Sequence, residues 1–154
     1  MGYTAERAGK VAEAQFFNMI ASINYPIGQL PGLTKSQLHQ LNSLGISTTF
    51  DLLRQGNSLA QRQQLSTQLS TNIKHINKWT ALANLARIPG VGCQYCGLLL
   101  HAGVSTPSQL ATMTVQRLHP QLLRLQVQLF RRADLAPDTS MVASWIRQAQ
   151  QMMS

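Results

Sequence analysis

The stretch Ile88-Pro89-Gly90-Val91-Gly92 decides the fold that this sequence predicts. Its glycines permit the positive φ angles of a tight turn between two helices. An apolar-rich helix follows and ends at Gly103, a residue type common in the left-handed position after a helix. We expect the turn to point backbone amides outward at a helix N-terminus, where they would bind an anion such as phosphate.

The same plan occurs earlier in the chain. Residues 30–53 pair without gaps with residues 88–111, each with a partner 58 positions later. Seven positions of the first copy meet identical residues: Pro31, Gly32, Leu41, Gly45, Ser47, Thr48 and Leu52. Each copy has a Pro-Gly turn, a helix, a stop glycine, a Ser-Thr pair and a second helix. Thr106 is expected to cap the last of these, with Pro107 at its first position. We interpret the sequence as an internal duplication.

The predicted fold class is all-α, because no alternating apolar pattern indicates a strand. An amphipathic helix over residues 5–23 forms an N-terminal segment, 1–26, and either covers the core or packs on a partner. Two units follow, 27–86 and 87–154. Each closes with a helix that carries a tryptophan, Trp79 or Trp145. Recurrence at equivalent ends favours core anchors over stacking platforms for nucleic-acid bases.

The helix expected around residues 120–132 combines apolar rows with a basic stripe. Leu118, Leu122, Leu125 and Leu129 form one row, and Leu123, Val127 and Phe130 form another. We expect most of this helix to be buried, with Arg117, Arg124 and Arg131 facing outward. The stripe either follows a phosphate backbone or is a solvated face.

The charge of the chain indicates a polyanionic partner. The 154 residues carry a formal net charge of +8, and no Asp or Glu occurs between Leu52 and Ala133. Such a field attracts nucleic acid, an acidic membrane surface or an acidic protein. No apolar run is long enough to cross a bilayer, so no membrane insertion is expected. Two cysteines cannot build a disulfide scaffold, and we predict a cytoplasmic protein.

Cys93 and Cys96 raise the hypothesis of a redox or metal site. A helix N-terminus would lower the pKa of the Cys93 thiol. Zinc needs four ligands, however, and His101 is the nearest candidate for a third. Cys96 aligns with Leu38, a core position, so it is expected to be a small apolar filler. We therefore predict no metal and no cofactor, and keep a thiol switch as a weaker alternative.

Catalysis is not predicted. The five acidic residues form no close pair suited to acid–base or two-metal chemistry: Glu6, Glu13, Asp51, Asp134 and Asp138. The four histidines show no metal-ligand spacing.

The turns resemble the helix-hairpin-helix motif, in which two short helices flank an apolar-Pro-Gly-apolar-Gly turn. Residues 30–111, and more loosely residues 24–151, are similar to tandem helix-hairpin-helix proteins of a domain-of-unknown-function family common in cyanobacteria. Trp-Ile-x-Gln-Ala at 145–149 adds to the likeness. The resemblance implies that turn amides grip a phosphate from the minor-groove side. Thr34 replaces the second glycine of the first turn, and Cys93 stands where DNA-binding hairpins usually have Pro, Lys or Arg. Glycosylases with this motif have an acidic catalytic residue soon after the hairpin, which this chain lacks.

These observations predict a non-enzymatic module that binds nucleic acid, duplex DNA above all, through its phosphate backbone and without sequence preference. The alternative is an adaptor for a protein partner, which the apolar N-terminal helix and the low charge density favour. The predicted contacts in the turns are Gly90, Val91, Gly92, Cys93, Gly32, Thr34 and Lys35. The surrounding field is predicted from Arg87, Arg117, Arg124, Arg131 and Arg132.

Overall fold

The computed structural model describes residues 22–153, and every regular element in that range is a helix. The prediction of an all-α fold is confirmed for this part of the chain. A single antiparallel bridge joins Pro26 to Thr48 without forming a strand. The amphipathic helix predicted over residues 5–23 lies outside the described residues, except for Ser22 and Ile23, which are not helical.

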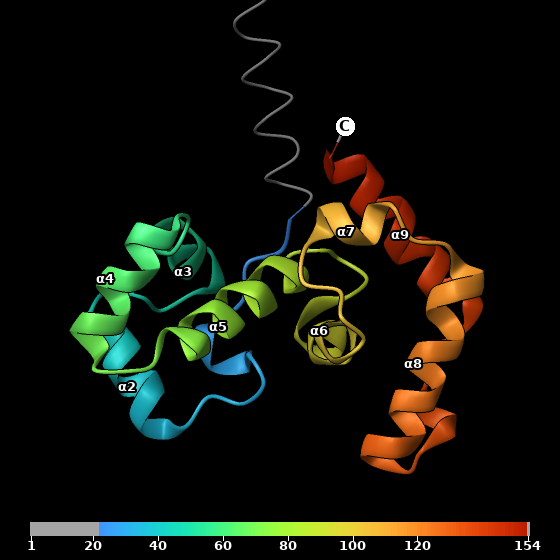
Figure 1. Cartoon of the computed structure of the whole chain (residues 1–154), viewed down its shortest axis with the longest axis horizontal. Helices are drawn as coiled ribbons and strands as arrows, with labels where there is room; N and C mark the ends of the chain where they lie inside the picture. The colour runs from blue at the N-terminus through green and yellow to red at the C-terminus, as the bar shows by residue number, and fades with distance from the viewer. Residues whose placement is uncertain (1–21, 154) are drawn as a thin grey trace, which may run out of the picture.

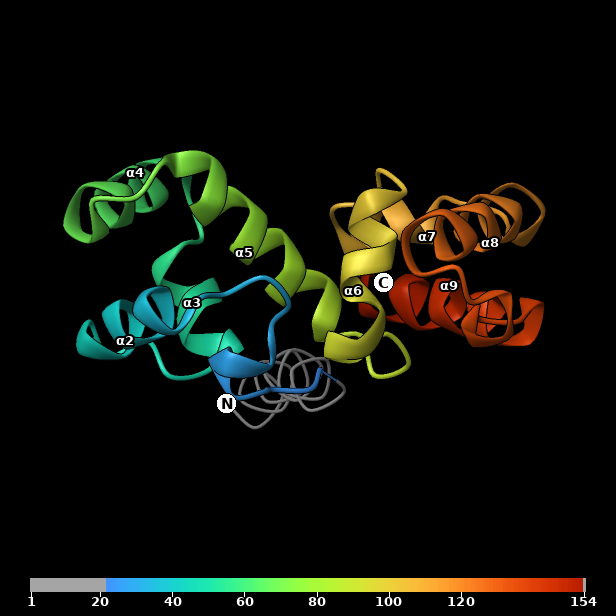
Figure 2. The ribbon, with the colours of Figure 1, turned by 90° about the horizontal axis from the view of Figure 1, so that it is seen from below.

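The elements fall into two groups along the chain. The first contains η1 (Ile27–Gln29), α2 (Lys35–Ser43), α3 (Thr49–Gln55), α4 (Leu59–Leu69) and α5 (Ile73–Ala86). The second contains α6 (Gly92–His101), α7 (Pro107–Ala111), α8 (Val115–Phe130), η2 (Ala133–Leu135) and α9 (Thr139–Met153). Helices α3 and α4 pack on α5, α2 lies beside α3, and α6 joins α5 to the group formed by α7, α8 and α9 (Figure 1). The view from below places α4 on one side of α5 and α2 and α3 on the other (Figure 2).

Helices α2 and α6 end in the same way. Gly45 and Gly103 adopt φ angles of 78° and 88°, a left-handed conformation that favours glycine. The amide of the next residue then reaches back to the third-last residue of the helix, from Ile46 to Leu41 O and from Val104 to Leu99 O, each at 3.0 Å. Both helix ends are therefore Schellman motifs, which satisfy carbonyl groups that a helix leaves free.

Helices α3 and α7 begin in the same way. Thr48 Oγ1 accepts a hydrogen bond from Asp51 N and Thr106 Oγ1 accepts one from Gln109 N, both at 3.1 Å. Pro107 occupies the start of α7, where its missing N–H costs nothing. The predicted cap of this helix is confirmed.

Both tryptophans lie in the core. Trp79 is 2% exposed and Trp145 is 1% exposed, which confirms their prediction as anchors. Trp145 comes from α9 and packs on Tyr95 of α6 with ring centroids 5.0 Å apart. Tilted aromatic rings at this distance attract one another. The contact therefore holds α9 against the turn between α5 and α6. Cys96 is also buried, as predicted.

Helix α8 differs from its prediction. It begins at Val115 and continues through Pro120, and its buried residues are Leu118, Leu122 and Gln126. The row that was expected to lie inward is instead exposed, as is the end of the first row: Leu123, Val127, Leu129 and Phe130. The prediction of a mostly buried helix is wrong, because within the described residues α8 packs mainly on α6 and α9 and leaves its far end uncovered.

Candidate functional site

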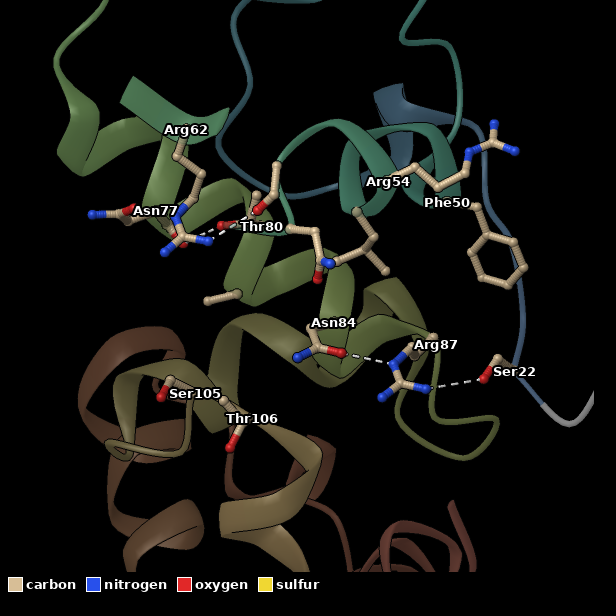
Figure 3. A pocket seen from close by; sticks show the side chains of 14 residues that line it. Ser22, Phe50, Arg54, Arg62, Asn77, Thr80, Asn84, Arg87, Ser105 and Thr106 are labelled. Atoms are coloured by element: carbon tan, nitrogen blue, oxygen red, sulfur yellow. Dashed lines mark hydrogen bonds between the residues drawn. The ribbon is translucent and has the colours of Figure 1, made fainter. Parts of the chain in front are cut away.

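A groove of about 970 Å³ lies between α3, α5 and the start of α7. Three arginines line it, Arg54, Arg62 and Arg87, together with asparagines and hydroxyl groups (Figure 3). No acidic residue lines it within the described part of the chain. We call this feature the arginine groove. Its composition favours an anionic ligand, because guanidinium groups bind phosphate in a fixed fork geometry.

Arg87 is half-buried at one end of the groove. Its Nε donates to Asn84 Oδ1 at 2.7 Å and its Nη1 donates to Ser22 Oγ at 3.3 Å (Figure 3). Both partners are neutral, and no described carboxylate pairs with this side chain. Burial lowers the pKa of Arg87 from its ordinary value, yet an arginine stays protonated in proteins. The groove thus holds a half-buried positive charge without a described counter-charge.

Arg62 is held at the other end of the groove. Its Nε donates to Asn77 Oδ1 and its Nη1 donates to the carbonyl of Gly56, both at 2.9 Å. Gly56 is required there, because a Cβ at this position would lie 2.8 Å from Thr80 Cγ2. The close approach of Gly56 to α5 therefore fixes the direction of the Arg62 guanidinium.

Arg54 lies at the rim and pairs with Asp51. Asp51 also accepts hydrogen bonds from the amides of Ser47 and Thr48, at 3.2 and 3.1 Å. The backbone bond from Ser47 is the main cause that lowers the pKa of Asp51 from 3.8 to about 2, and Thr48 and Arg54 add to it. The carboxylate is therefore ionised at neutral pH, and its hydrogen bonds stabilise the start of α3.

Replacing Asp51 with Asn is expected to destabilise the protein at pH 7 by about 1 kcal/mol, a value discounted for solvent screening. A carboxyl group whose pKa falls on folding stabilises the folded state above its unfolded pKa. That contribution disappears as the pH falls from about 4 to 2. Thermal unfolding at several pH values should therefore show wild type and Asp51→Asn converging in acid. Asp134→Asn, at an exposed ion pair, is the control and should behave like wild type throughout. A constant difference between wild type and Asp51→Asn down to pH 2 would contradict this assignment.

The second turn does not have the geometry expected of it. Its Gly90 amide donates to Gln148 Oε1 of α9 at 2.8 Å. The amides of Val91 and Gly92 both donate to Ile88 O, at 3.0 and 3.1 Å, and both residues are buried. Three of the four predicted phosphate contacts in this turn are therefore already used inside the protein. Helix α9 accounts for the Gly90 amide, since Gln148 and Trp145 lie against Gly90, whereas the Val91 and Gly92 amides are used within the turn itself.

Cys93 also departs from its prediction. Burial raises the pKa of the Cys93 thiol, so the expected lowering at the helix N-terminus is wrong. Burial is likewise the main cause that raises the pKa of Cys96 to about 12, and nearby Cys93 adds to it. Both thiols are free and protonated at neutral pH, a state in which a thiol is a poor nucleophile.

The first turn keeps the exposed geometry that was predicted for it. Gly32 is exposed with a φ of 85°, and the amides of Gly32 and Leu33 donate to no group in residues 22–153. Thr34 differs, because its amide and its hydroxyl form a capping box with Gln37. Lys35 is exposed beside the turn, and Lys78 of α5 approaches it, since a Cβ added at Gly32 would lie 3.7 Å from Lys78 Nζ.

The remaining predicted arginines lie in the second group of helices. Arg117 and Arg124 are exposed on α8, where Arg124 borders a small hollow with His101. Arg131 ends α8 in a left-handed conformation, with a φ of 54°. Arg132 pairs with Asp134 at 2.8 Å. The structure thus does not bring these arginines to either turn, since α8 extends away from α5 (Figure 1).

The sequence prediction missed the arginine groove as a site. It named Arg87, but it did not include Arg54 and Arg62 among the predicted contacts. A usable signal was present along α5, where Asn77 and Asn84 lie seven positions apart and Arg87 follows three positions later, a spacing that places all three on one face.

No helix among residues 22–153 is long and apolar enough to cross a membrane. No curated protein and no solved structure matches the chain. A family model described as a domain of unknown function, DUF4332, matches residues 31–152. Because this match covers well over half of the 154 residues, the chain belongs to the DUF4332 family.

Proposed function

We propose that this DUF4332 protein is a non-enzymatic module that binds nucleic acid through the phosphate backbone, without sequence preference. The observation that carries the proposal is the positive charge that no local carboxylate balances. Of the eleven Lys and Arg side chains in residues 22–153, Arg54 and Arg132 form ion pairs, which leaves nine without one among the described residues. A field of this kind attracts a polyanion and releases its counterions on binding.

The described carboxylates support a binding role over a catalytic one. Asp51 and Asp134 pair with arginines, and Asp138 accepts the amide of Met141 at 2.8 Å at the start of α9. Each of these carboxylates thus interacts with a neighbouring group of its own segment. No two of them form the acid–base pair that hydrolytic chemistry uses.

We also infer that the two groups of helices are copies of one helix-hairpin-helix unit. The matching Schellman ends of α2 and α6 and the matching threonine caps of α3 and α7 support this inference. The first turn is then the copy that contacts duplex DNA, because its Gly32 and Leu33 amides have no described acceptor and two lysines lie beside it. The two free thiols favour a reducing compartment such as the cytoplasm.

The double variant Lys35→Gln/Lys78→Gln is expected to weaken duplex binding about tenfold at about 50 mM salt. It should also reduce the slope of log K against log salt by about 1.8, since each lost phosphate contact removes about 0.9. Fluorescence anisotropy with a labelled duplex of mixed sequence measures both quantities. The control Arg147→Gln/Ser140→Glu changes the net charge by the same amount at exposed positions of α9. Equal affinities of the two double variants would exclude the first turn as the contact.

A protein-interaction adaptor is the second candidate. It is favoured by the exposed apolar end of α8 and η2, where Leu129, Phe130 and Leu135 are 47%, 57% and 53% exposed. Exposed apolar groups that gather in one place commonly mark an interface. The same titration separates the two functions: no binding to either duplex or single-stranded oligonucleotides at about 50 mM salt would favour the adaptor.

A further inference from the structure

We infer that the arginine groove binds an unpaired stretch of nucleic acid, with phosphates on Arg62 and Arg87 and a base against Phe50. The inference rests on the proposed function and adds to it a second surface with a different specificity. The first turn contacts the outside of a duplex, whereas the groove is built for a strand that enters it.

The spacing of the two asparagines that hold these guanidinium groups fits about three nucleotides of one strand. Asn77 holds Arg62 and Asn84 holds Arg87, and both asparagines belong to α5. Asn84 lies seven positions after Asn77, which corresponds to about 10 Å along the helix axis. A stacked strand carries roughly one phosphate per 3.4 Å, so about three nucleotides span this distance.

Each guanidinium group is oriented before a ligand arrives. The asparagine Oδ1 atoms, the Gly56 carbonyl and the Ser22 hydroxyl accept from its N–H groups. Both side chains line the groove (Figure 3), and their remaining N–H groups have no acceptor among the described residues. Because the side chains are already held, less rotamer entropy is lost when an anion binds.

Arg87 points most directly to an anion. Within residues 22–153 this charge is half-buried and has only neutral partners, which is unfavourable unless an opposite charge binds there. The burial that lowers its pKa is consistent with this view. A phosphate bridging to Arg87 would supply the missing charge through charge-assisted hydrogen bonds.

The remaining lining fits a base better than a second phosphate. Phe50 presents a half-buried ring at the edge of the groove (Figure 3), and unpaired bases stack on such rings regardless of their identity. The Nδ2 groups of Asn77 and Asn84 have no partner within the described residues and face acceptors on a bound base or sugar. Side-chain amides and hydroxyls can form hydrogen bonds with any of the bases, so no strong sequence preference is expected.

A duplex fits this groove poorly. Duplex DNA is stiff over about 150 base pairs, and its phosphates lie on a convex surface. Arg87 is recessed between α5 and the segment at Ser22, so a rigid rod reaches the rim at Arg54 but not Arg87. An unpaired strand bends freely and exposes its bases, which is what the lining requires.

The test compares single-strand and duplex binding of the full chain by fluorescence anisotropy, with a labelled 15-nucleotide strand of mixed sequence and its duplex. Arg62→Gln/Arg87→Gln should weaken single-strand binding at least tenfold and duplex binding less than threefold. It should also lower the single-strand salt slope by about 1.4, since each contact contributes about 0.7. Arg147→Gln/Ser140→Glu, with the same change in net charge, should alter neither affinity more than threefold.

A second variant keeps the inference testable if the double variant unfolds. Phe50→Leu retains every arginine and should weaken single-strand binding about fivefold or more, as expected for the loss of one stacked base, without affecting the duplex. If wild type binds single strands while the groove variants match the control, the groove is excluded and the proposed function stands. If wild type binds neither probe, both proposals fail. If adenosine monophosphate competes with an affinity equal to that of the strand, the site holds one nucleotide and the strand assignment is overturned.

Discussion

Replacing Trp145 with alanine is expected to lower the free energy of unfolding by about 3–5 kcal/mol, the usual cost of removing a buried aromatic side chain. Trp145 is 1% exposed and lies where three parts of the chain meet: α9, Tyr95 of α6 and the turn at Gly90. Its loss leaves a cavity that rigid neighbours cannot close. Urea denaturation followed by circular dichroism measures the change.

The control for this variant is Phe130→Ala. Phe130 is an aromatic residue of the same fold, but it is 57% exposed at the end of α8. Its replacement is expected to change the stability by less than about 0.5 kcal/mol. Equal effects of the two variants would show that α9 is not held on the turn in the way described.

Replacing Gly90 with alanine is expected to destabilise the protein by about 2–4 kcal/mol, from overpacking and from a lost hydrogen bond. A Cβ at this position would lie 2.7 Å from Trp145 Cδ1 and 3.0 Å from Gln148 Oε1. The buried Trp145 ring cannot move aside without opening the core. The turn must therefore separate from α9, and the bond from Gly90 N to Gln148 must lengthen or break.

Gly97→Ala is the matched control in the next helix. A Cβ there would lie 3.5 Å from Pro31 Cγ, an ordinary contact distance. Alanine is favoured over glycine inside a helix by about 1 kcal/mol, so this variant should be neutral or slightly more stable. If Gly90→Ala melts at the same temperature as Gly97→Ala, α9 does not close the second turn.

The class and much of the local structure of this protein could be predicted from its sequence. Gly45 and Gly103 indicated helix ends because glycine adopts positive φ without strain, and both helices stop there. Thr106 followed by Pro107 indicated a helix start for similarly local reasons. Signals of this kind depend on a few neighbouring residues, so they can be identified without tertiary contacts.

The accessibility of the second turn could not be predicted in this way. Whether the Gly90 amide faces solvent depends on Gln148, which lies 58 residues later in the chain. The exposure of Phe130 could not be predicted for the same reason, because an apolar row on a helix does not show whether another element covers it. The arginine groove joins Arg54, Arg62 and Arg87 from separate segments, which the packing of α3 and α4 on α5 brings together.

The most direct test of the account is a titration of wild-type protein against labelled single-stranded and duplex oligonucleotides at two salt concentrations. We expect binding to both probes at about 50 mM salt and a loss of about a hundredfold in duplex affinity at about 200 mM, the change that neutralising about four phosphates produces. Absence of binding to both probes at the lower concentration, or an affinity that does not change with salt, would contradict it.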